Sequence, residues 1–186
     1  MNWRTNHSTI LVKNTFYCWG GNQKDLPRPF VHDTEEKRKI TSTVDIFQLE
    51  TFKWERKSTT SNPPAGVVDY ACTSLKDSIL YFGGCCKPAD CFHNNLYKLN
   101  TLTLNWNEII STTTDNIPMR KYGCGMISFN VNGEDHLFLS GGIGPTPLTR
   151  QTHAQYVTSP DSPNTCLLYT SPSPRDRTRS RMPSSA

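Results

Sequence analysis

The sequence predicts an all-β protein built from repeated four-stranded antiparallel units. Three observations support this: a Gly-Gly pair that recurs three times, a β-rich run before each pair, and a tryptophan after the first two pairs. The pairs begin at Gly20, Gly83 and Gly141. The periods are therefore 63 residues (20 to 83) and 58 residues (83 to 141).

The run before each glycine pair is predicted to be a buried strand. Residues 16–19, 79–82 and 136–140 are rich in aromatic and branched side chains, which suit the pleated surface of a sheet. Glycine at the end of each run permits backbone conformations that other residues avoid.

A second strand is expected before each of these runs, so that the two form a hairpin. His7 and Tyr70 each lie 13 residues before the first glycine of their pair, with a short polar turn in between. In the third copy Tyr122 lies 19 residues before Gly141, and the six additional residues fall around Asn132-Gly133, a dipeptide that favours hairpin turns. The third hairpin is therefore expected to be longer.

Two further strands follow in the first two copies. Residues 43–49 alternate apolar and polar side chains and lead to Trp54, and residues 95–99 lead to Trp106. Polar connectors containing proline, residues 58–64 and 111–118, then end each unit. Each complete copy thus supplies four strands.

A four-stranded unit with Gly-Gly after its second strand, then an aromatic residue (Phe47 or Tyr97) and then a tryptophan, resembles the kelch repeat. The resemblance implies a kelch-type β-propeller fragment of two four-stranded blades plus the first hairpin of a third. The tryptophans are expected to fill the wedge between adjacent blades. The residues assigned a structural role in the repeat are Gly20, Gly21, Trp54, Gly83, Gly84, Trp106, Gly141 and Gly142.

The domain organisation follows from where the repeat stops. Residues 3–147 form the propeller fragment, with repeats at about 3–63, 64–118 and 119–147, and residues 148–186 form a disordered Ser/Pro/Arg-rich tail. This tail is either translated adapter sequence or a basic tail with phosphorylatable Ser-Pro sites. Because a propeller needs about four to eight blades to close, the open blade faces and strand edges are expected to promote association.

Charge and hydropathy argue against nucleic-acid and membrane partners. The net charge is +4, but residues 166–186 hold four arginines and one aspartate, which leaves only +1 for residues 1–165. The chain has no apolar stretch of signal-peptide or membrane-spanning length, so a cytoplasmic protein, with access to the nucleus, is expected. Seven cysteines without a secretion signal are expected to be reduced thiols.

The function predicted from these features is protein binding without catalysis or a cofactor. The sequence has no nucleophile elbow, phosphate-binding glycine loop or metal-binding His pair. The resemblance implies a protein or peptide ligand bound by loops after the second strands and between blades, as in kelch substrate receptors or adaptors of cullin-type ubiquitin ligases. The predicted polar anchors are Arg28, His32, Arg38, Arg120 and Lys121.

One cluster keeps an alternative open, a kelch-fold enzyme or metal-binding protein of the oxidase type. Cys85, Cys86, Cys91 and His93 provide three thiols and an imidazole within nine residues. Their spacing matches no Cys-x-x-Cys pair, so an ordinary loop between strands is the favoured interpretation.

Overall fold

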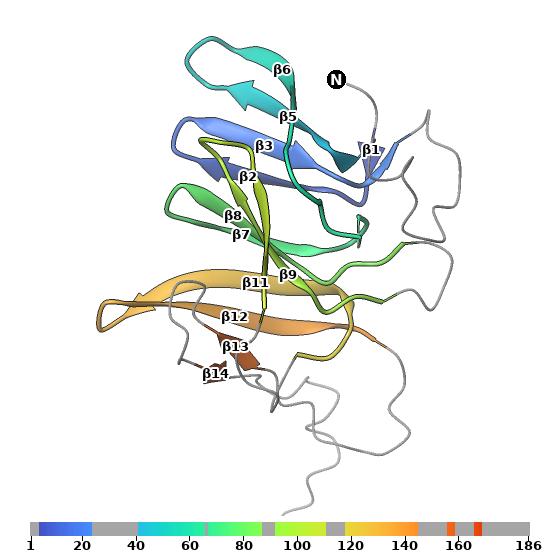
Figure 1. Cartoon of the computed structure of the whole chain (residues 1–186), viewed down its shortest axis with the longest axis vertical. Helices are drawn as coiled ribbons and strands as arrows, with labels where there is room; N and C mark the ends of the chain where they lie inside the picture. Colours follow the sequence, from blue (N-terminus) through green and yellow to red (C-terminus); the bar gives the residue numbers. More distant parts are fainter. Residues whose placement is uncertain are drawn as a thin grey trace, which may run out of the picture.

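A computed structural model describes residues 4–23, 41–65, 67–86, 92–110, 118–144, 156–158 and 166–168. The described strands form antiparallel sheets that stack one upon another, as the kelch propeller prediction requires (Figure 1). No helix in these residues is long and apolar enough to cross a membrane.

Blade 1 is a four-stranded antiparallel sheet in the order β2-β3-β5-β6, so that sequence order and spatial order agree. A short pair of strands, β1 and β4, extends it beside the first Gly-Gly pair. The bounds are β1 (Arg4–Thr5), β2 (Ser8–Val12), β3 (Thr15–Trp19), β4 (Asn22–Gln23), β5 (Thr43–Gln48) and β6 (Lys53–Ser58).

Blade 2 repeats this sheet with the order β7-β8-β9-β10, and blade 3 consists of the hairpin β11-β12. The strands of blade 2 are β7 (Ala71–Leu75), β8 (Ser78–Phe82), β9 (Leu96–Asn100) and β10 (Trp106–Ile109). Those of blade 3 are β11 (Tyr122–Val131) and β12 (Glu134–Ile143). Two complete blades and a third hairpin are thus confirmed.

Two three-residue strands lie within the segment predicted to be disordered. β13 (Tyr156–Thr158) pairs with β14 (Cys166–Leu168), and both lie next to β12 (Figure 1). The other residues of 148–186 lie outside the described part of the chain, so the tail assignment stays a prediction.

The strand register corrects the alignment of the third repeat. Ala71 pairs with Phe82 and Gly125 pairs with Ser140, each one residue before the first glycine of its pair. Cys124, and not Tyr122, is therefore the equivalent of Tyr70. The hairpin is extended by two residues in each strand instead of by a six-residue insertion at the turn, and because a paired extension leaves the turn unchanged, spacing alone could not reveal it.

A left-handed residue immediately before each of these positions supports this register. Asn6, Asp69 and Gly123 have φ angles of 58°, 53° and 63°, respectively. The residues that lie two positions before these left-handed residues are therefore equivalent as well; they are Arg4, Val67 and Lys121.

Aromatic side chains fill the junction between blades 1 and 2. The ring of Trp19 lies 5.3 Å from those of Tyr70 and Tyr81 and 5.0 Å from that of Trp106, measured between ring centroids. Trp19 and Trp106 are almost completely buried. Trp106 contacts the rings of Trp19 and Tyr81 and so lies in the wedge between the two blades, as expected.

Trp54 occupies the equivalent position in blade 1 but does not fill a wedge here. It pairs with Phe47 as Trp106 pairs with Leu99, and its side chain is 43% exposed. The tryptophan of blade 2 faces the preceding blade, and within the described residues no blade precedes blade 1. The wedge expected around Trp54 is therefore not formed in the described part of this chain.

Mainly aliphatic side chains, together with Phe82, form the junction between blades 2 and 3. Leu80 and Phe82 of β8 belong to the same buried cluster as Met126, Leu137 and Leu139 of blade 3. The two junctions therefore share their backbone geometry but not their side-chain chemistry.

Candidate functional site at the loop end of the blades

The glycine pairs and the connectors between blades lie at one end of the stacked sheets, opposite the β2-β3 and β7-β8 turns (Figure 1). We call this end the loop face. Its described segments are residues 4–7, 20–23, 67–70, 83–86, 92–95 and 118–123.

The second glycine of each of the first two pairs holds the next blade through its backbone. The Gly21 N–H donates to the carbonyl of Val67 over 2.6 Å, and the Gly84 N–H donates to that of Lys121 over 2.9 Å. A Cβ atom at Gly20 would lie 2.6 Å from the Val67 oxygen, closer than real Cβ contacts allow. At Gly20 this close approach of two backbone segments leaves no room for a side chain.

The left-handed residues form a second backbone connection between blades. The Asp69 N–H donates to the carbonyl of Asn6 (3.1 Å), and the Gly123 N–H donates to that of Asp69 (2.7 Å). The Asn6 side-chain amide also donates to the Asp69 carboxylate over 2.7 Å. These bonds fix the ends of the inner strands relative to one another.

A basic side chain donates to the carbonyl of the first glycine in blades 1 and 3. The guanidinium of Arg4 donates to Gly20 O over 2.8 Å, and the ammonium of Lys121 donates to Gly141 O over 3.1 Å. Burial lowers the pKa of Lys121 from its usual value. Blade 2 has Val67 at this position, so the basic side chain is optional whereas the glycine is not.

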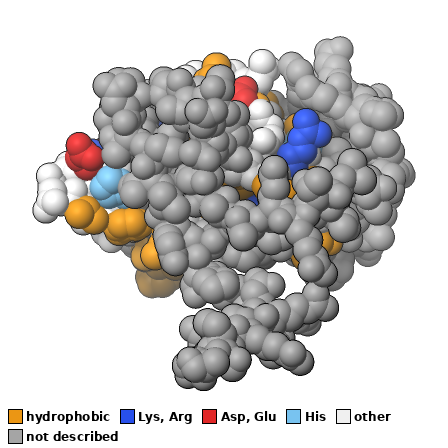
Figure 2. All heavy atoms as spheres, turned by 90° about the horizontal axis from the view of Figure 1, so that it is seen from below, with side chains coloured by type: hydrophobic (Ala, Val, Ile, Leu, Met, Phe, Trp, Pro, Cys, Tyr) orange, Lys and Arg blue, Asp and Glu red, His pale blue; other side chains and the backbone are white. Residues whose placement is uncertain are grey.

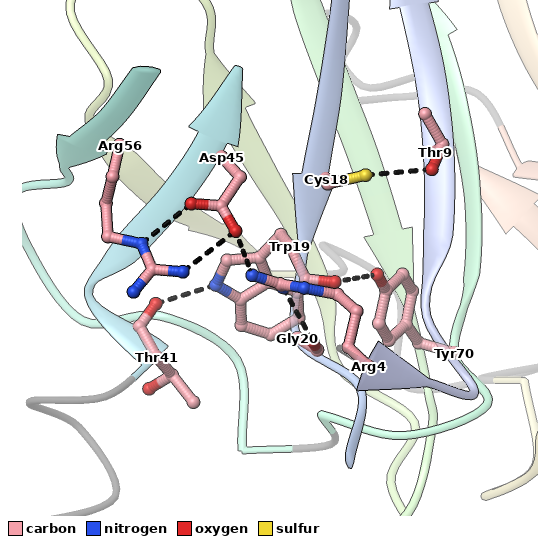
Figure 3. A network of polar contacts seen from close by, with 9 residues as sticks. All are labelled: Arg4, Thr9, Cys18, Trp19, Gly20, Thr41, Asp45, Arg56 and Tyr70. Atoms are coloured by element: carbon pink, nitrogen blue, oxygen red, sulfur yellow. Dashed lines mark hydrogen bonds and ion pairs between the residues drawn. The ribbon is translucent and has the colours of Figure 1, made fainter. Parts of the chain in front are cut away.

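Arg4 is also part of a partly buried ionic network with Asp45 and Arg56 (Figure 3). Arg56 Nε lies 2.7 Å from the Asp45 carboxylate, whose side chain is only 5% exposed. Burial opposes the ionisation of Asp45, but hydrogen bonds and charges from Arg56 and Arg4 outweigh it and lower its pKa. The network links β1 to β5 and β6.

The hydroxyl of Tyr70 joins blade 2 to two backbone groups of blade 1. It accepts a hydrogen bond from the Ser8 N–H over 3.1 Å. It also donates to the carbonyl of Trp19 (Figure 3). Trp19 in turn donates its indole N–H to the carbonyl of Thr41 over 2.6 Å. Burial raises the pKa of the Tyr70 hydroxyl, which therefore stays protonated.

The cysteine-histidine cluster is divided between two environments. Cys85 is buried in the aromatic core as a reduced thiol, whereas Cys86 is disulfide-bonded, and its Sγ lies 3.2 Å from Nε2 of His93. Cys91 lies outside the described residues. Among the residues that the structure describes, no group of three His, Cys, Asp or Glu side chains is placed to hold a metal ion.

The expectation that all cysteines are reduced thiols is wrong at Cys86, which is disulfide-bonded. Cys85 and Cys86 are both buried, but adjacent residues of an extended chain point to opposite sides, and only Cys85 packs in the aromatic cluster. The thiols of Cys18, Cys72, Cys85 and Cys124 are reduced. Burial raises the pKa of the Cys72 thiol to about 11, so this thiol is neutral at physiological pH.

The predicted polar anchors are placed unevenly. Arg120 is exposed on the loop face, whereas Lys121 is buried and donates to the Gly141 carbonyl. Arg28, His32 and Arg38 lie outside the described residues.

Sequence reasoning missed an aromatic feature of the loop face. The rings of Phe92 and Tyr122 stack with centroids 5.5 Å apart and planes 7° apart, and both side chains are half-buried. Since the two residues lie thirty positions apart and on different blades, only the register could bring them together.

These stacked sheets, with clamped glycines and loops gathered at one end, define a β-propeller scaffold. The chain belongs to the kelch-repeat family, because the family model of the KLHDC2/KLHL20/DRC7 Kelch-repeats domain matches residues 1–142.

Curated relatives agree with this assignment. The chain is similar to Kelch domain-containing protein 3 of Bos taurus, with 30% identity over 106 residues that cover 57% of this chain and 25% of the relative. It is 34% identical over 100 residues to Kelch domain-containing protein 2 of Bos taurus, covering 54% and 23%. It is 25% identical over 144 residues to Tip elongation aberrant protein 1 of Schizosaccharomyces pombe, covering 75% and 11%. The chain thus spans about a quarter of the first two relatives.

Proposed function

We propose that this chain is a protein-interaction module that binds a protein or peptide through its loop face. The observation that supports this most directly is the backbone clamp at the glycine pairs, which fixes the origin of each loop on the scaffold. Loops on a rigid scaffold can differ in sequence without disturbing the fold, and such loops commonly carry recognition.

The exposed groups of the loop face suit a polar or acidic partner. Arg120 is exposed, and the Phe92-Tyr122 stack provides a flat apolar surface on the neighbouring connector. An arginine beside aromatic rings is a common composition for protein interfaces. Arg28, His32 and Arg38 of the first loop are proposed to add to the same surface.

We further propose that the parent protein is a substrate receptor or adaptor of a cullin-type ubiquitin ligase, acting in the cytoplasm or nucleus. Membership of the kelch family supports the interaction role, and the sequence of the repeats supports the ligase role by resemblance. In this proposal the loop face selects the substrate, and the ligase contact lies elsewhere.

Affinity capture of the tagged protein with quantitative mass spectrometry tests the binding role. The doubly substituted variant Arg28→Ala with Arg38→Ala is expected to lose a set of partners that wild type retains. Lys53→Ala with Lys57→Ala, two exposed charges on the outer strand β6, is the matched control and should keep them. If both variants retain the same partners, the loop face is not the binding surface.

The ligase role needs a separate measurement. A cullin should be present in the captures from wild type and from both variants, because the substrate surface and the ligase contact differ. Captures that contain loop-dependent partners but no cullin would leave the interaction module intact and reject the ligase role.

A further inference from the structure

We propose that Asn132 is a site of spontaneous deamidation and that the side chain of Asn130 controls how fast this modification occurs. Both residues lie at the turn end of the β11-β12 hairpin, opposite the loop face (Figure 1). The modification is a chemical change of the chain itself and requires no enzyme. The inference is therefore independent of the ligand proposed above.

The turn of this hairpin is a two-residue loop. Val131 pairs with Glu134, so that Asn132 and Gly133 alone connect the two strands. Their φ angles of 53° and 89° are both left-handed, as a hairpin turn of this length favours. Asn132-Gly133 is also the only Asn-Gly dipeptide in the sequence. In Figure 2 this end of the hairpin lies at the left edge, where acidic and uncharged polar atoms are found beside a histidine.

The reaction takes place between these two neighbouring residues. The backbone nitrogen of Gly133 attacks Cγ of Asn132, and the new N–C bond closes a cyclic imide. The bond between Cγ and the side-chain nitrogen breaks, and this nitrogen leaves as ammonia with the proton that the Gly133 N–H has lost. Water then opens the ring to give aspartate or isoaspartate. Glycine favours the attack because it has no Cβ to obstruct the approach of its nitrogen.

The nitrogen that must attack is held by a hydrogen bond. The Gly133 N–H donates to Oδ1 of Asn130 over 3.0 Å. The attack requires this N–H to lose its proton and the nitrogen to turn toward Cγ of Asn132, so the hydrogen bond must break before the imide can form. The bond therefore stabilises the unreacted turn relative to the transition state and slows the reaction.

Asn130 is itself held in place from blade 2. Its Nδ2 donates to Oδ1 of Asp135 over 2.8 Å, and Oδ2 of the same carboxylate lies 2.5 Å from Nζ of Lys76. Because an ionised carboxylate only accepts hydrogen bonds, the NH₂ group of Asn130 must face Asp135, which directs Oδ1 at Gly133. Lys76 lies in the turn between β7 and β8. The junction between blades 2 and 3 thus fixes the orientation of the amide that restrains Gly133.

Deamidation would weaken this end of the hairpin in two ways. Isoaspartate adds a carbon to the main chain, and a two-residue turn cannot take up the additional atom while Val131 stays paired with Glu134. The new carboxylate would also lie close to Glu134 and Asp135, and like charges at such positions repel one another. The product would therefore loosen the contact between blades 2 and 3 that slows its own formation.

Incubation of the full chain at mildly alkaline pH, followed by peptide mass spectrometry, measures the modified fraction at Asn132. Asn130→Ala should raise the rate roughly 2- to 10-fold, the range expected for the loss of one hydrogen bond. Lys76→Met leaves the hairpin sequence unchanged and should raise the rate by a smaller factor. Lys13→Met is the matched control, because Lys13 has the same φ as Lys76 (52°) and its Nζ lies 2.6 Å from the Asp77 carboxylate at the preceding junction. This control should be modified at the wild-type rate.

The same measurement in guanidinium chloride separates the effect of the fold from that of the local sequence. All four unfolded proteins should be modified at one common rate, faster than folded wild type, because the hydrogen bonds that distinguish them form only in the folded chain. Equal rates for folded wild type and folded Asn130→Ala would overturn the proposal. So would the absence of modification at Asn132 in every folded protein, or equal acceleration by Lys13→Met and Lys76→Met.

Discussion

Tyr70→Phe is expected to destabilise the fold far more than removing one surface hydroxyl would suggest. The substitution keeps the ring in the aromatic cluster but removes the acceptor for the Ser8 N–H and the donor to the Trp19 carbonyl. Each buried backbone group left without a partner costs about 1–3 kcal/mol. Because Ser8 is only half-buried, we expect a loss of about 2–4 kcal/mol in the free energy of unfolding.

Urea unfolding followed by circular dichroism, at one low protein concentration, measures this loss. Tyr97→Phe is the control, since the Tyr97 hydroxyl lies 3.3 Å from the exposed Glu108 carboxylate, and its removal should cost less than about 0.5 kcal/mol. The cost at Tyr70 should not change up to about pH 10, because burial raises the pKa of this hydroxyl above that usual tyrosine value. Equal stability of the two variants would refute the bridging role.

Three further predictions use contrasts within the repeat. Trp106→Ala should cost about 3–5 kcal/mol in the free energy of unfolding, because Trp106 is buried. The equivalent Trp54→Ala should cost about 1 kcal/mol at low protein concentration, because Trp54 is 43% exposed. Thermal unfolding of the two variants measures this difference. Gly20→Ala should lower the free energy of unfolding by about 3 kcal/mol or more, and Gly133→Ala should lower it by about 1–2 kcal/mol. Both glycines have a positive φ, but only at Gly20 would the added Cβ also clash with another backbone segment. Urea unfolding of the two variants measures the difference. Because the pKa of Asp45 is lowered in the folded state, its ionisation stabilises the fold above its unfolded pKa of about 4, and this contribution is lost as pH falls through the folded value. An acid titration of Asp45→Asn should therefore show a weaker loss of stability below about pH 4 than wild type, from a lower starting stability at neutral pH.

The repeat could be predicted from sequence because its strongest constraints act on the backbone. Gly20 and Gly83 allow two backbone segments to approach within a distance that any side chain would prevent. The glycine pair therefore recurs in each copy of the repeat and marks the blades in the sequence. The side chain that follows the left-handed residue is less constrained: His7, Tyr70 and Cys124 all occupy that position. An alignment that matches Tyr70 to a tyrosine of the third repeat therefore selects Tyr122, which lies two residues before the true equivalent, Cys124.

The loop face could be predicted only in outline. The location of the loop face followed from the glycine pairs. Which of its charged side chains are exposed to a partner depends on how deeply each is buried, and no local sequence pattern reveals this. Arg120 and Lys121 are adjacent in sequence, yet one is exposed and the other donates to Gly141 from a buried position. The stack of Phe92 on Tyr122 joins two blades and has no signal within either repeat.

The division between backbone and side-chain constraints also explains how the scaffold can tolerate changes of side chain. At the first junction Trp19 lies against Tyr81 and Trp106, whereas the equivalent of Trp19 at the second junction is Phe82, packed among aliphatic side chains. The junctions nevertheless use the same pair of backbone hydrogen bonds. Since those bonds involve no particular side chain, residues in the loops and at the blade surfaces can change while the blades keep their places, and the glycines are the positions at which change is least tolerated.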